Sequence, residues 1–348
     1  MIKRAVVILN LGGPDRLSSV QPFLFNLFND KAIINLPKPL RWVVAKVISI
    51  RRAPIAKKIY SEIGGKSPIL ELTREQARDL EISLNSNKNI KSKVFVAMRY
   101  WHPMTSSTAI SVKNFNPDEI VLLPLYPQFS STTTGSSLKI WSLVANKIKL
   151  KKPTKIICCY PVDDGVIQAQ AELLTKEIAK AKKNVRILFS AHGLPKKIIK
   201  AGDPYQWQVE KMARKIATKI NIEFDKWAIC YQSRVGPLEW IGPSLDEELK
   251  RASKDKIGVV VLPIAFVSEH SETLVELDIE YRKMASDLNI PYYGRVPALG
   301  TQPYFINGLK NLVDSATKSD LSVISGCGKR ICPENRQCYI QTERNKNA

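Results

Sequence analysis

The sequence predicts an α/β protein of two similar doubly wound domains, each a four-stranded parallel sheet flanked by helices, with an active cleft between them. Short β-branched apolar runs alternate with helix-length segments, which is typical of parallel sheets with right-handed crossovers. The chain has 348 residues, 44% of them apolar and 24% charged, which is ordinary for a globular protein and long enough for two domains. The two halves also resemble each other.

This internal repeat pairs four strand-like runs in the same order. Residues 5–14 (AVVILNLGGP) resemble residues 186–195 (RILFSAHGLP), since each run breaks into a Gly-Pro turn. Three further pairs are 94–103 with 227–237, 121–136 with 260–273, and 156–161 with 292–297. We therefore expect an N-terminal domain at 1–162, a second domain with the metal site at 163–312, and a helix end with a cysteine-containing tail at 313–348.

The stretch 257–283 organises the second half. Residues 258–266 are apolar and uncharged, which predicts a strand buried on both faces. Helical spacing then begins and is carried by Leu274, Leu277, Tyr281 and Met284. The prediction is a strand feeding a helix through a short polar turn.

Three acids lie along that helix. Glu272, Glu276 and Glu280 fall at i, i+4 and i+8, and so share one face. A solvated face of an amphipathic helix explains the pattern by itself. Their position at the carboxyl end of a buried strand, where α/β sheets bind ligands, instead favours a site for a cation.

The three histidines of the chain all follow strand-like runs. They are His102, His192 and His270. A single histidine at such a place is often a structural one that bonds a backbone carbonyl. Three of three at strand ends favours a functional site.

The charge and the ends of the chain restrict partners and location. The net charge is +21, from 53 Lys and Arg against 32 Asp and Glu, but the excess is scattered, so no nucleic-acid partner is expected. The first apolar run stops at Gly12 without a cleavage site, and no run reaches the ~18 residues that span a bilayer. With six cysteines and no export signal, we expect reduced thiols and a cytoplasmic protein.

The first half carries an insertion at about 21–59, which is apolar and interrupted by cations such as Arg41, Lys46 and Arg51. This composition fits a lip over a hydrophobic pocket, an interfacial basic helix, or a buried helix with snorkelling cations. The loop 130–137 is rich in Ser and Thr, which suits a weak anion site or plain helix capping.

The tail places Cys327, Cys332 and Cys338 close together, as C-x4-C-x5-C. Three thiols could bind zinc, or an iron–sulfur cluster with a fourth thiol from Cys158 or Cys159. The spacing is not that of a standard finger, and unbound reduced cysteines are an equal alternative.

Nine motifs in order carry a family resemblance. They are ILNLGGP, PFLFNLFND, IGGKSPI, MRYWHP, PLYPQFSSTTTGSS, FSAHGLP, GDPYQ, YQSRVGPLEWIGPS and PIAFVSEHSETLVELDIEY. Over about residues 2–312 the chain resembles the ferrochelatases of the bacterial type. The resemblance implies a chelatase-type fold and insertion of Fe²⁺ into protoporphyrin IX with release of two protons, the last step of heme biosynthesis. It also implies that the 21–59 lip covers the porphyrin and contacts the inner face of the membrane peripherally.

The resemblance also implies roles for residues. His192 and Glu272 would be catalytic and, with His270, would hold the iron. Glu276 and Glu280 would form a path for protons or metal. The implied porphyrin contacts are Leu11, Arg99, Tyr100, Ser130, Ser233 and Trp240, with Arg99 pairing a propionate and Leu11 leaving one face of the ring without a protein ligand.

Two positions depart from the family pattern. Glu269 stands where many members have Asp, which keeps the charge. Cluster-bearing animal relatives have a C-x2-C-x4-C tail and a further cysteine after an Ile-Gln pair, whereas Ala169 follows Ile167 and Gln168 here. The sequence therefore disfavours a [2Fe-2S] cluster. Two other functions stay open: a chelatase for another tetrapyrrole, such as coproporphyrin, or another metal, and a non-catalytic protein that binds heme or nucleic acid.

Overall fold

The computed structural model describes residues 1–86, 89–181, 184–234, 236, 238–337 and 339. The chain forms two compact units. Unit 1 comprises Met1–Tyr126, Ser130–Cys158 and Lys310–Ile324, and unit 2 comprises Pro127–Phe129, Cys159–Leu309 and Ser325–Ala348. Because these units are defined by contacts and not by independent folding, the domain boundaries at 162 and 312 stay predictions.

The sheet of unit 1 has the strand order β2-β1-β3-β4-β9. Its strands are β1 (Ile2–Asn10), β2 (Ile90–Met98), β3 (Glu119–Pro124), β4 (Thr154–Cys159) and β9 (Val323–Ser325). Its helices are α1 (Val20–Phe28), α2 (Lys38–Ser61), α3 (Ile69–Leu84), α4 (Thr105–Phe115), α5 (Thr134–Lys147) and part of α11 (Pro303–Lys318). The prediction of four strands was wrong by one, because β9 has only three residues and such a run has no readable period.

Strand β1 is central because it is apolar on both faces. Its residues from Ala5 to Leu9 are at most 1% exposed. It pairs in parallel with β2 on one side and with β3 on the other, in the registers Ile2↔Ile90 and Arg4↔Glu119. An uninterrupted apolar strand is stable only when helices cover both faces of its sheet.

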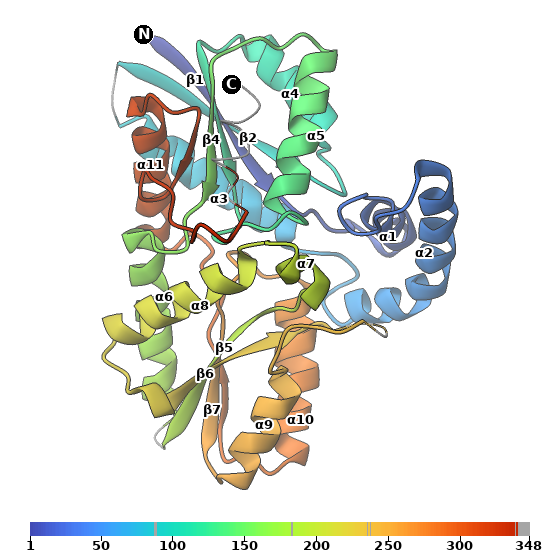
Figure 1. Cartoon of the computed structure of the whole chain (residues 1–348), viewed down its shortest axis with the longest axis vertical. Coiled ribbons are helices and arrows are strands. Elements are labelled where there is room, and N and C mark those ends of the chain that lie inside the picture. Colours follow the sequence, from blue (N-terminus) through green and yellow to red (C-terminus); the bar gives the residue numbers. More distant parts are fainter. Residues whose placement is uncertain (87–88, 182–183, 235, 237, 338, 340–348) are drawn as a thin grey trace. The chain divides into compact units, whose positions relative to one another are not determined.

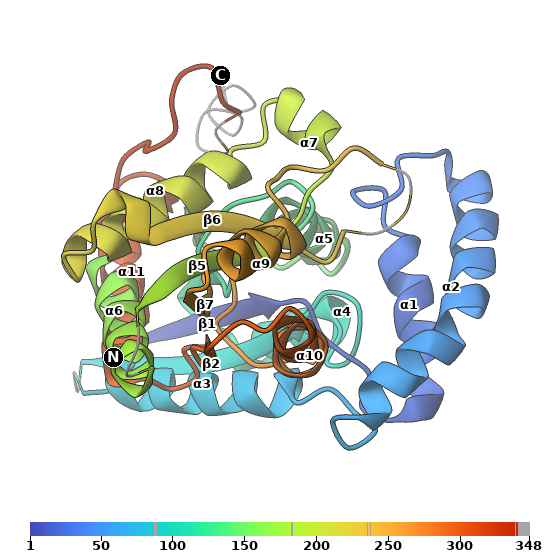
Figure 2. The same cartoon turned by 90° about the horizontal axis from the view of Figure 1, so that it is seen from below.

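The predicted insertion forms α1 and α2, which lie side by side in both views of the chain (Figure 1 and Figure 2). Helix α2 buries small residues at Ala45, Ser49 and Ala53, four positions apart. Such spacing aligns them on one face, so two helices can approach closely.

Unit 2 repeats the topology of unit 1, with the strand order β6-β5-β7-β8. Its strands are β5 (Val185–His192), β6 (Trp227–Gln232), β7 (Gly258–Pro263) and β8 (Tyr293–Arg295). Its helices are α6 (Asp164–Lys180), α7 (Lys196–Lys200), α8 (Tyr205–Lys219), α9 (Leu245–Lys254), the π-helix η3 (Glu272–Tyr281) and α10 (Arg282–Asp287). In each unit the second strand lies beside the first and the third lies on its other side, so the predicted pair of similar doubly wound sheets is confirmed.

Both faces of this sheet are covered. Figure 1 shows α6 and α8 on one side of it and α9 and α10 on the other. On the α9 side Leu249, Val261 and Leu277 share one buried cluster, which joins α9, β7 and η3. Burial of such side chains contributes about 1.5–3 kcal/mol each.

The helix after β7 differs from the prediction. The spacing of Leu274, Leu277, Tyr281 and Met284 predicted an α-helix, whereas residues Glu272–Tyr281 form a π-helix and α10 follows it. A spacing of three to four positions is that of an α-helix, whereas a π-helix bonds from i to i+5 and has more residues per turn, so the apolar pattern indicated the wrong helix type.

Candidate functional site

Three strand ends of unit 2 bring the predicted metal-site residues together. His192 ends β5, Ser233 follows β6, and Glu272 begins η3 after β7. Because β6 and β7 lie on opposite sides of β5, the chain leaves β5 at the topological switch point of the sheet. Doubly wound sheets bind their ligands at this point.

His192 and Glu272 form a direct pair. The Nδ1 atom of His192 lies 2.9 Å from Oε2 of Glu272, and their side chains are 39% and 25% exposed. Burial by itself would lower the pKa of His192, but the Glu272 carboxylate raises it above its ordinary value. Burial would raise the pKa of Glu272, yet the two histidines and Ser233 lower it to about 2. Since an ionised carboxylate only accepts, Nδ1 carries the proton and Nε2 is left for a ligand.

Glu276 is held beside Glu272 by Ser233. The backbone N–H of Ser233 donates to Oε1 of Glu276 at 2.8 Å, and its hydroxyl donates to Oε2 of Glu276 at 2.5 Å and to Oε2 of Glu272 at 3.3 Å. Ser233 has φ 59°, a left-handed conformation that is uncommon for non-glycine residues. Burial and the Glu272 carboxylate raise the pKa of Glu276 to about 7. Glu280 continues the row at the exposed end of η3.

The elevated pKa of Glu276 predicts a pH dependence of stability in the metal-free protein. The folded state holds this proton more tightly than the unfolded chain, whose value is near 4.5, so stability is lost as pH rises toward about 7. We expect the free energy of unfolding, measured with urea, to fall between about pH 4.5 and 7.5 in wild type. In Glu276→Gln this fall should be smaller by roughly 1–3 kcal/mol. Identical pH slopes for the two proteins would show that Glu276 is not held in this way.

His270 lies on the turn before η3 and is 7% exposed. Its Nδ1 is 3.2 Å from the carbonyl oxygen of Ser268, and its Nε2 is 4.0 Å from Oε1 of Glu272. Burial lowers the pKa of His270 below its ordinary value, so the ring is neutral at pH 7. A neutral imidazole whose one nitrogen donates to a carbonyl presents the other as a metal ligand.

Trp240 packs over the turn that follows His192. Pro195 and Trp240 form an antiparallel bridge, and a Cβ at Gly193 would lie 3.4 Å from Cε3 of Trp240 and 3.1 Å from the Gln232 carbonyl. The indole N–H of Trp240 is buried and has no hydrogen-bond partner among the residues that the structure describes. Glycine at 193 thus permits the indole to approach the end of β5.

In unit 1, Arg99 is engaged by its own unit. Its Nε donates to the Ser136 hydroxyl and its Nη2 to Oδ2 of Asp30, each at 2.7 Å, and its guanidinium lies 4.7 Å from the Tyr100 ring centroid. The Tyr100 hydroxyl also donates to Oδ2 of Asp30, at 2.7 Å. Burial would raise the pKa of Asp30, but its bond from Ser136 and the charge of Arg99 lower it. Asp30 therefore fixes Arg99 and Tyr100 together.

The other predicted porphyrin contacts of unit 1 lie at strand ends. Leu11 follows β1, is half-buried, and its carbonyl accepts from the Tyr100 N–H at 3.0 Å. Ser130 is 1% exposed, and its hydroxyl is 2.8 Å from that of Thr132. Tyr100 is likewise 1% exposed, within an apolar cluster that includes Val20.

The two described tail cysteines differ in their surroundings. Cys327 is exposed, while Cys332 is buried and its sulfur lies 3.2 Å from Nε2 of Gln208. Cys158 and Cys159 are buried near the end of β4, and Cys338 lies outside the described residues. Within the described part of the chain, no three His, Cys, Asp or Glu side chains are grouped as ligands of a metal ion.

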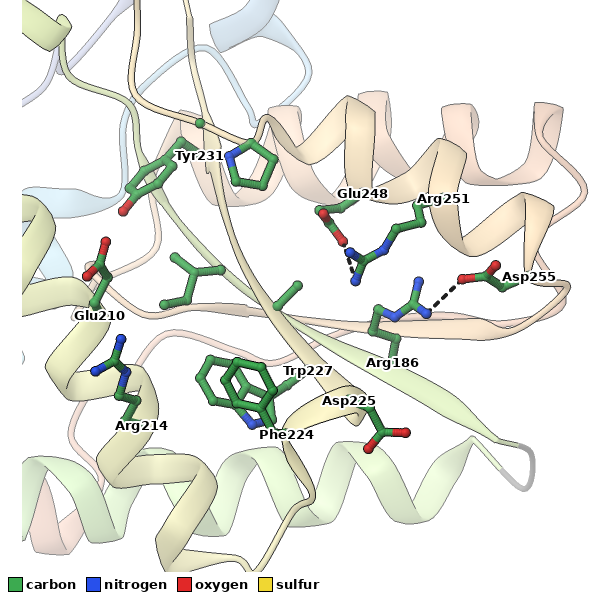
Figure 3. A pocket seen from close by; sticks show the side chains of 14 residues that line it. Arg186, Glu210, Arg214, Phe224, Asp225, Trp227, Tyr231, Glu248, Arg251 and Asp255 are labelled. Atoms are coloured by element: carbon green, nitrogen blue, oxygen red, sulfur yellow. Dashed lines mark hydrogen bonds and ion pairs between the residues drawn. The ribbon is translucent and has the colours of Figure 1, made fainter.

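A separate groove of about 770 Å³ lies beside the edge strand β6, and none of the predicted site residues lines it (Figure 3). Its cations are largely matched by acids. Arg186 bonds Asp255 at 2.7 Å and Arg251 lies 3.1 Å from Glu248. These ion pairs neutralise the two arginines, which would otherwise attract an anionic ligand to the groove.

Sequence reasoning missed three residues of these networks. Gln232 donates to Glu276 at 3.2 Å and accepts from the buried Ser190 hydroxyl at 2.7 Å, and Asp30 anchors Arg99. A signal existed for Asp30, which is the single acid within residues 21–59. Gln232 and Ser190 carry no such signal, because an uncharged residue at a strand end is common.

Comparison with known proteins gives consistent similarities. A family model described as Ferrochelatase matches residues 3–317. The chain is 51% identical to the ferrochelatase of Pelagibacter ubique (strain HTCC1062), over 96% of this chain and 97% of the relative. It is 51% identical to that of Caulobacter vibrioides (strain NA1000 / CB15N), over 97% of each chain, and 49% identical to that of Rickettsia bellii (strain OSU 85-389), over 95% and 92%.

Solved structures resemble the fold. SirB from Bacillus subtilis with Fe³⁺ has a TM-score of 0.55 at 13% identity, covering 91% of this chain and 97% of that one. The sirohydrochlorin chelatase SirB from Bacillus subtilis subspecies spizizenii in complex with cobalt has a TM-score of 0.54 at 10% identity, covering 92% and 97%. At these identities the likeness shows the fold alone, and the predicted chelatase-type α/β fold is confirmed.

Proposed function

The chain belongs to the ferrochelatase family, the lyases that insert Fe²⁺ into protoporphyrin IX in heme biosynthesis, and we propose that His192, Glu272 and Glu276 of unit 2 carry out this reaction. The reaction consumes one ferrous ion and one porphyrin and releases two pyrrole protons. One observation carries the assignment. An ionised carboxylate orients an imidazole at a topological switch point, and a carboxyl with a pKa of about 7 lies beside it.

His192 is placed to meet the reacting atoms. Its Nδ1 is occupied by Glu272, so Nε2 is the atom that would bind the iron or accept a pyrrole proton. The side chain is 39% exposed, which leaves the ring accessible. Glu272 fixes the tautomer and stabilises the imidazolium that proton transfer forms.

The iron is a substrate that must be released into the ring, so few protein ligands are needed. Glu272 and His270 supply one carboxylate and one neutral imidazole, which are ligands that suit a divalent ion of this type. The four pyrrole nitrogens complete the coordination as the ion is transferred. A site with more protein ligands would bind the iron more tightly and so oppose its transfer to the porphyrin.

Glu276 is suited to remove the protons. A group with a pKa of about 7 is both a usable base and a usable acid near neutral pH. The proposed path runs from His192 through Glu276 to Glu280, which is exposed at the far end of η3. The Ser233 hydroxyl contacts both Glu272 and Glu276, and Glu272 bonds His192, so these four side chains form one connected network.

For the porphyrin, we propose contacts with Leu11, Arg99, Tyr100 and Ser130 of unit 1 and with Ser233 and Trp240 of unit 2. Arg99 uses Nε and Nη2 within unit 1, so a propionate would be bound through Nη1 of a guanidinium that is already fixed. Leu11 is apolar and offers the metal no ligand. Within the described residues the buried indole N–H of Trp240 is a donor that has no acceptor.

A [2Fe-2S] cluster has no part in this proposal. Among the described thiols, Cys332 lies 3.2 Å from Nε2 of Gln208 and Cys327 lies 3.7 Å from the Lys329 carbonyl oxygen. These surroundings support reduced cysteines, and Fe²⁺ enters only as substrate.

Helix α2 supports a peripheral contact with the inner face of a membrane. Four of its exposed apolar side chains follow helical spacing, and with their exposed fractions they are Leu40 (51%), Val43 (51%), Val47 (43%) and Ile50 (50%). Cations such as Arg41 and Lys46 border this stripe, as in interfacial helices. Among the helices that the structure describes, none combines the length and apolar character needed to cross a bilayer.

Vesicle binding tests the role of α2. Val43→Asp with Val47→Asp should weaken binding to vesicles rich in anionic phosphatidylglycerol by at least about tenfold, because two apolar anchors are lost. Ile82→Asp is the matched control, since Ile82 is an apolar residue of α3 that is 67% exposed. If wild type and both variants bind alike, or none binds, α2 is not a membrane contact, and its stripe is left as the lip over the porphyrin.

The reaction itself is tested by anaerobic turnover. Wild-type protein with Fe²⁺ and protoporphyrin IX should quench porphyrin fluorescence as heme forms. Coproporphyrin, offered in competition, should be the poorer substrate. Tight porphyrin binding without insertion of any divalent metal would contradict the proposal and indicate a carrier.

A further inference from the structure

We propose that Arg295 is a positioning residue for metal insertion, because its guanidinium binds Glu269 and Asp278 together and so holds η3 in its π-helical form. The inference rests on the proposed function of Glu272 and Glu276, whose relative placement η3 determines. Arg295 ends β8, and no role in the reaction follows from its place in the sequence.

The contacts of Arg295 reach both ends of the segment that carries the acids. Its Nη1 donates to Oε1 of Glu269 at 2.5 Å. Its Nε lies 3.1 Å from each carboxylate oxygen of Asp278, and its Nη2 also donates to Oδ2 of Asp278. The guanidinium thus binds Asp278 in a bidentate manner and Glu269 through a single hydrogen bond, and the Arg295 side chain is only 10% exposed.

The two bound carboxylates bracket the proposed catalytic acids. Glu269 lies three residues before Glu272, and Asp278 lies two residues after Glu276. A second contact supports the same tie, because the Tyr293 hydroxyl, also on β8, donates to the Leu277 carbonyl at 2.7 Å. Strand β8 therefore fixes both the turn before η3 and the later part of η3.

Among the described residues, Arg295 is the cation that pairs with Glu269. Oε1 of Glu269 also accepts from the Ala298 N–H at 2.9 Å, while its Oε2 is buried and has no hydrogen-bond partner within the described part of the chain. A buried carboxylate with an unsatisfied oxygen is costly, and a paired arginine offsets this cost. The turn that carries His270 is thus tied to Arg295.

A π-helix needs such external support. π-Helical hydrogen bonds run from i to i+5 and are usually confined to single turns, whereas η3 spans ten residues. A π-helix has more residues per turn than an α-helix, so conversion to an α-helix would rotate Glu276 relative to Glu272. Glu276 would then lose its bonds from Ser233, which depend on the present arrangement.

Arginine is required because of its shape. Its planar fork bonds one carboxylate through two nitrogens and still presents a third nitrogen to another acid, whereas lysine offers a single ammonium. Arg295→Lys therefore keeps the positive charge but cannot bond Glu269 and Asp278 at the same time, which is the pair of contacts that we call the bracket. Arg251→Lys is the matched control, since Arg251 also pairs with an acid of unit 2, Glu248 at 3.1 Å, has a side chain that is 50% exposed, and lies on α9 away from η3.

The experiment compares kcat, the KM for protoporphyrin IX and amide hydrogen exchange in wild type and both variants. Arg295→Lys should lower kcat about 10- to 100-fold, because small misplacements of catalytic groups have effects of this size. Its KM for porphyrin should change less than twofold, and amides of residues 272–281 should exchange at least tenfold faster. Arg251→Lys should match wild type in all three measurements.

The outcomes separate positioning from simple stability. If Arg295→Lys lowers the folded fraction but folded enzyme keeps wild-type kcat, or if exchange of 272–281 is unchanged, the proposal is overturned. Should Arg295→Lys fail to fold, Arg295→Met with Glu269→Gln and Asp278→Asn removes all the buried charges together. That protein should fold with lowered kcat, and wild-type kcat would overturn the proposal. Absence of turnover in wild type would instead refute the proposed function, while the exchange measurement still tests the bracket.

Discussion

Replacing His192 with alanine is expected to lower iron insertion by about 10²- to 10⁴-fold, the usual contribution of a positioned acid–base group. The variant loses the one ring nitrogen that Glu272 orients toward a ligand. Porphyrin binding should persist, because the fold does not depend on this half-exposed side chain. The measurement is anaerobic turnover with Fe²⁺, together with quenching of porphyrin fluorescence on binding.

His102→Ala is the matched control for this variant. His102 also follows a strand, but it is exposed and lies in unit 1. The His102→Ala variant should insert iron at the wild-type rate. Near-normal turnover of His192→Ala would remove His192 from the mechanism, and equal loss in both variants would indicate a general effect of removing a histidine.

Glu272→Gln is expected to reduce insertion by a similar factor, about 10²-fold or more, for a different physical reason. The amide keeps the shape of the side chain but removes the charge that raises the pKa of His192. It also removes the carboxylate ligand of the iron. Both kcat and the apparent affinity for Fe²⁺ should fall, which steady-state rates at varied Fe²⁺ would show.

The control for this variant is Glu223→Gln, an exposed carboxylate of the same unit. It changes the net charge equally and should keep wild-type rates. If Glu272→Gln retains the wild-type KM for Fe²⁺ with a lowered kcat, Glu272 acts through His192 alone and is not a metal ligand. If both constants are unchanged, the role assigned to Glu272 is wrong.

Asp30 shows how a site in a basic protein can depend on a single acid. The Oδ2 atom of Asp30 accepts hydrogen bonds from Arg99, Tyr100 and Ser136, and the side chain is 8% exposed. Removing one partner of a buried pair leaves the other charge uncompensated. Asp30 therefore determines where the Arg99 guanidinium lies and which of its nitrogens are left for a ligand.

The sequence by itself determined the repeated topology. The four pairs of strand-like runs form four strands in each sheet, in the same order, because apolar runs and Gly-Pro turns are local signals that can be read without the tertiary structure. The sequence also placed His192 and Glu272 at strand ends, and parallel strands bring such ends to one edge. That Nδ1 of His192 lies 2.9 Å from Glu272 is a consequence of this topology.

Tertiary structure alone decided the rest. The apolar spacing of residues 274–284 is that of an α-helix, so the sequence does not indicate the π form, which is accompanied by contacts from β8 through Arg295 and Tyr293. The bonds from Ser233 to Glu276 join residues 43 positions apart. Side chains so distant in sequence leave no periodic pattern, so the pKa of Glu276 and the bracket around η3 follow only from how the chain packs.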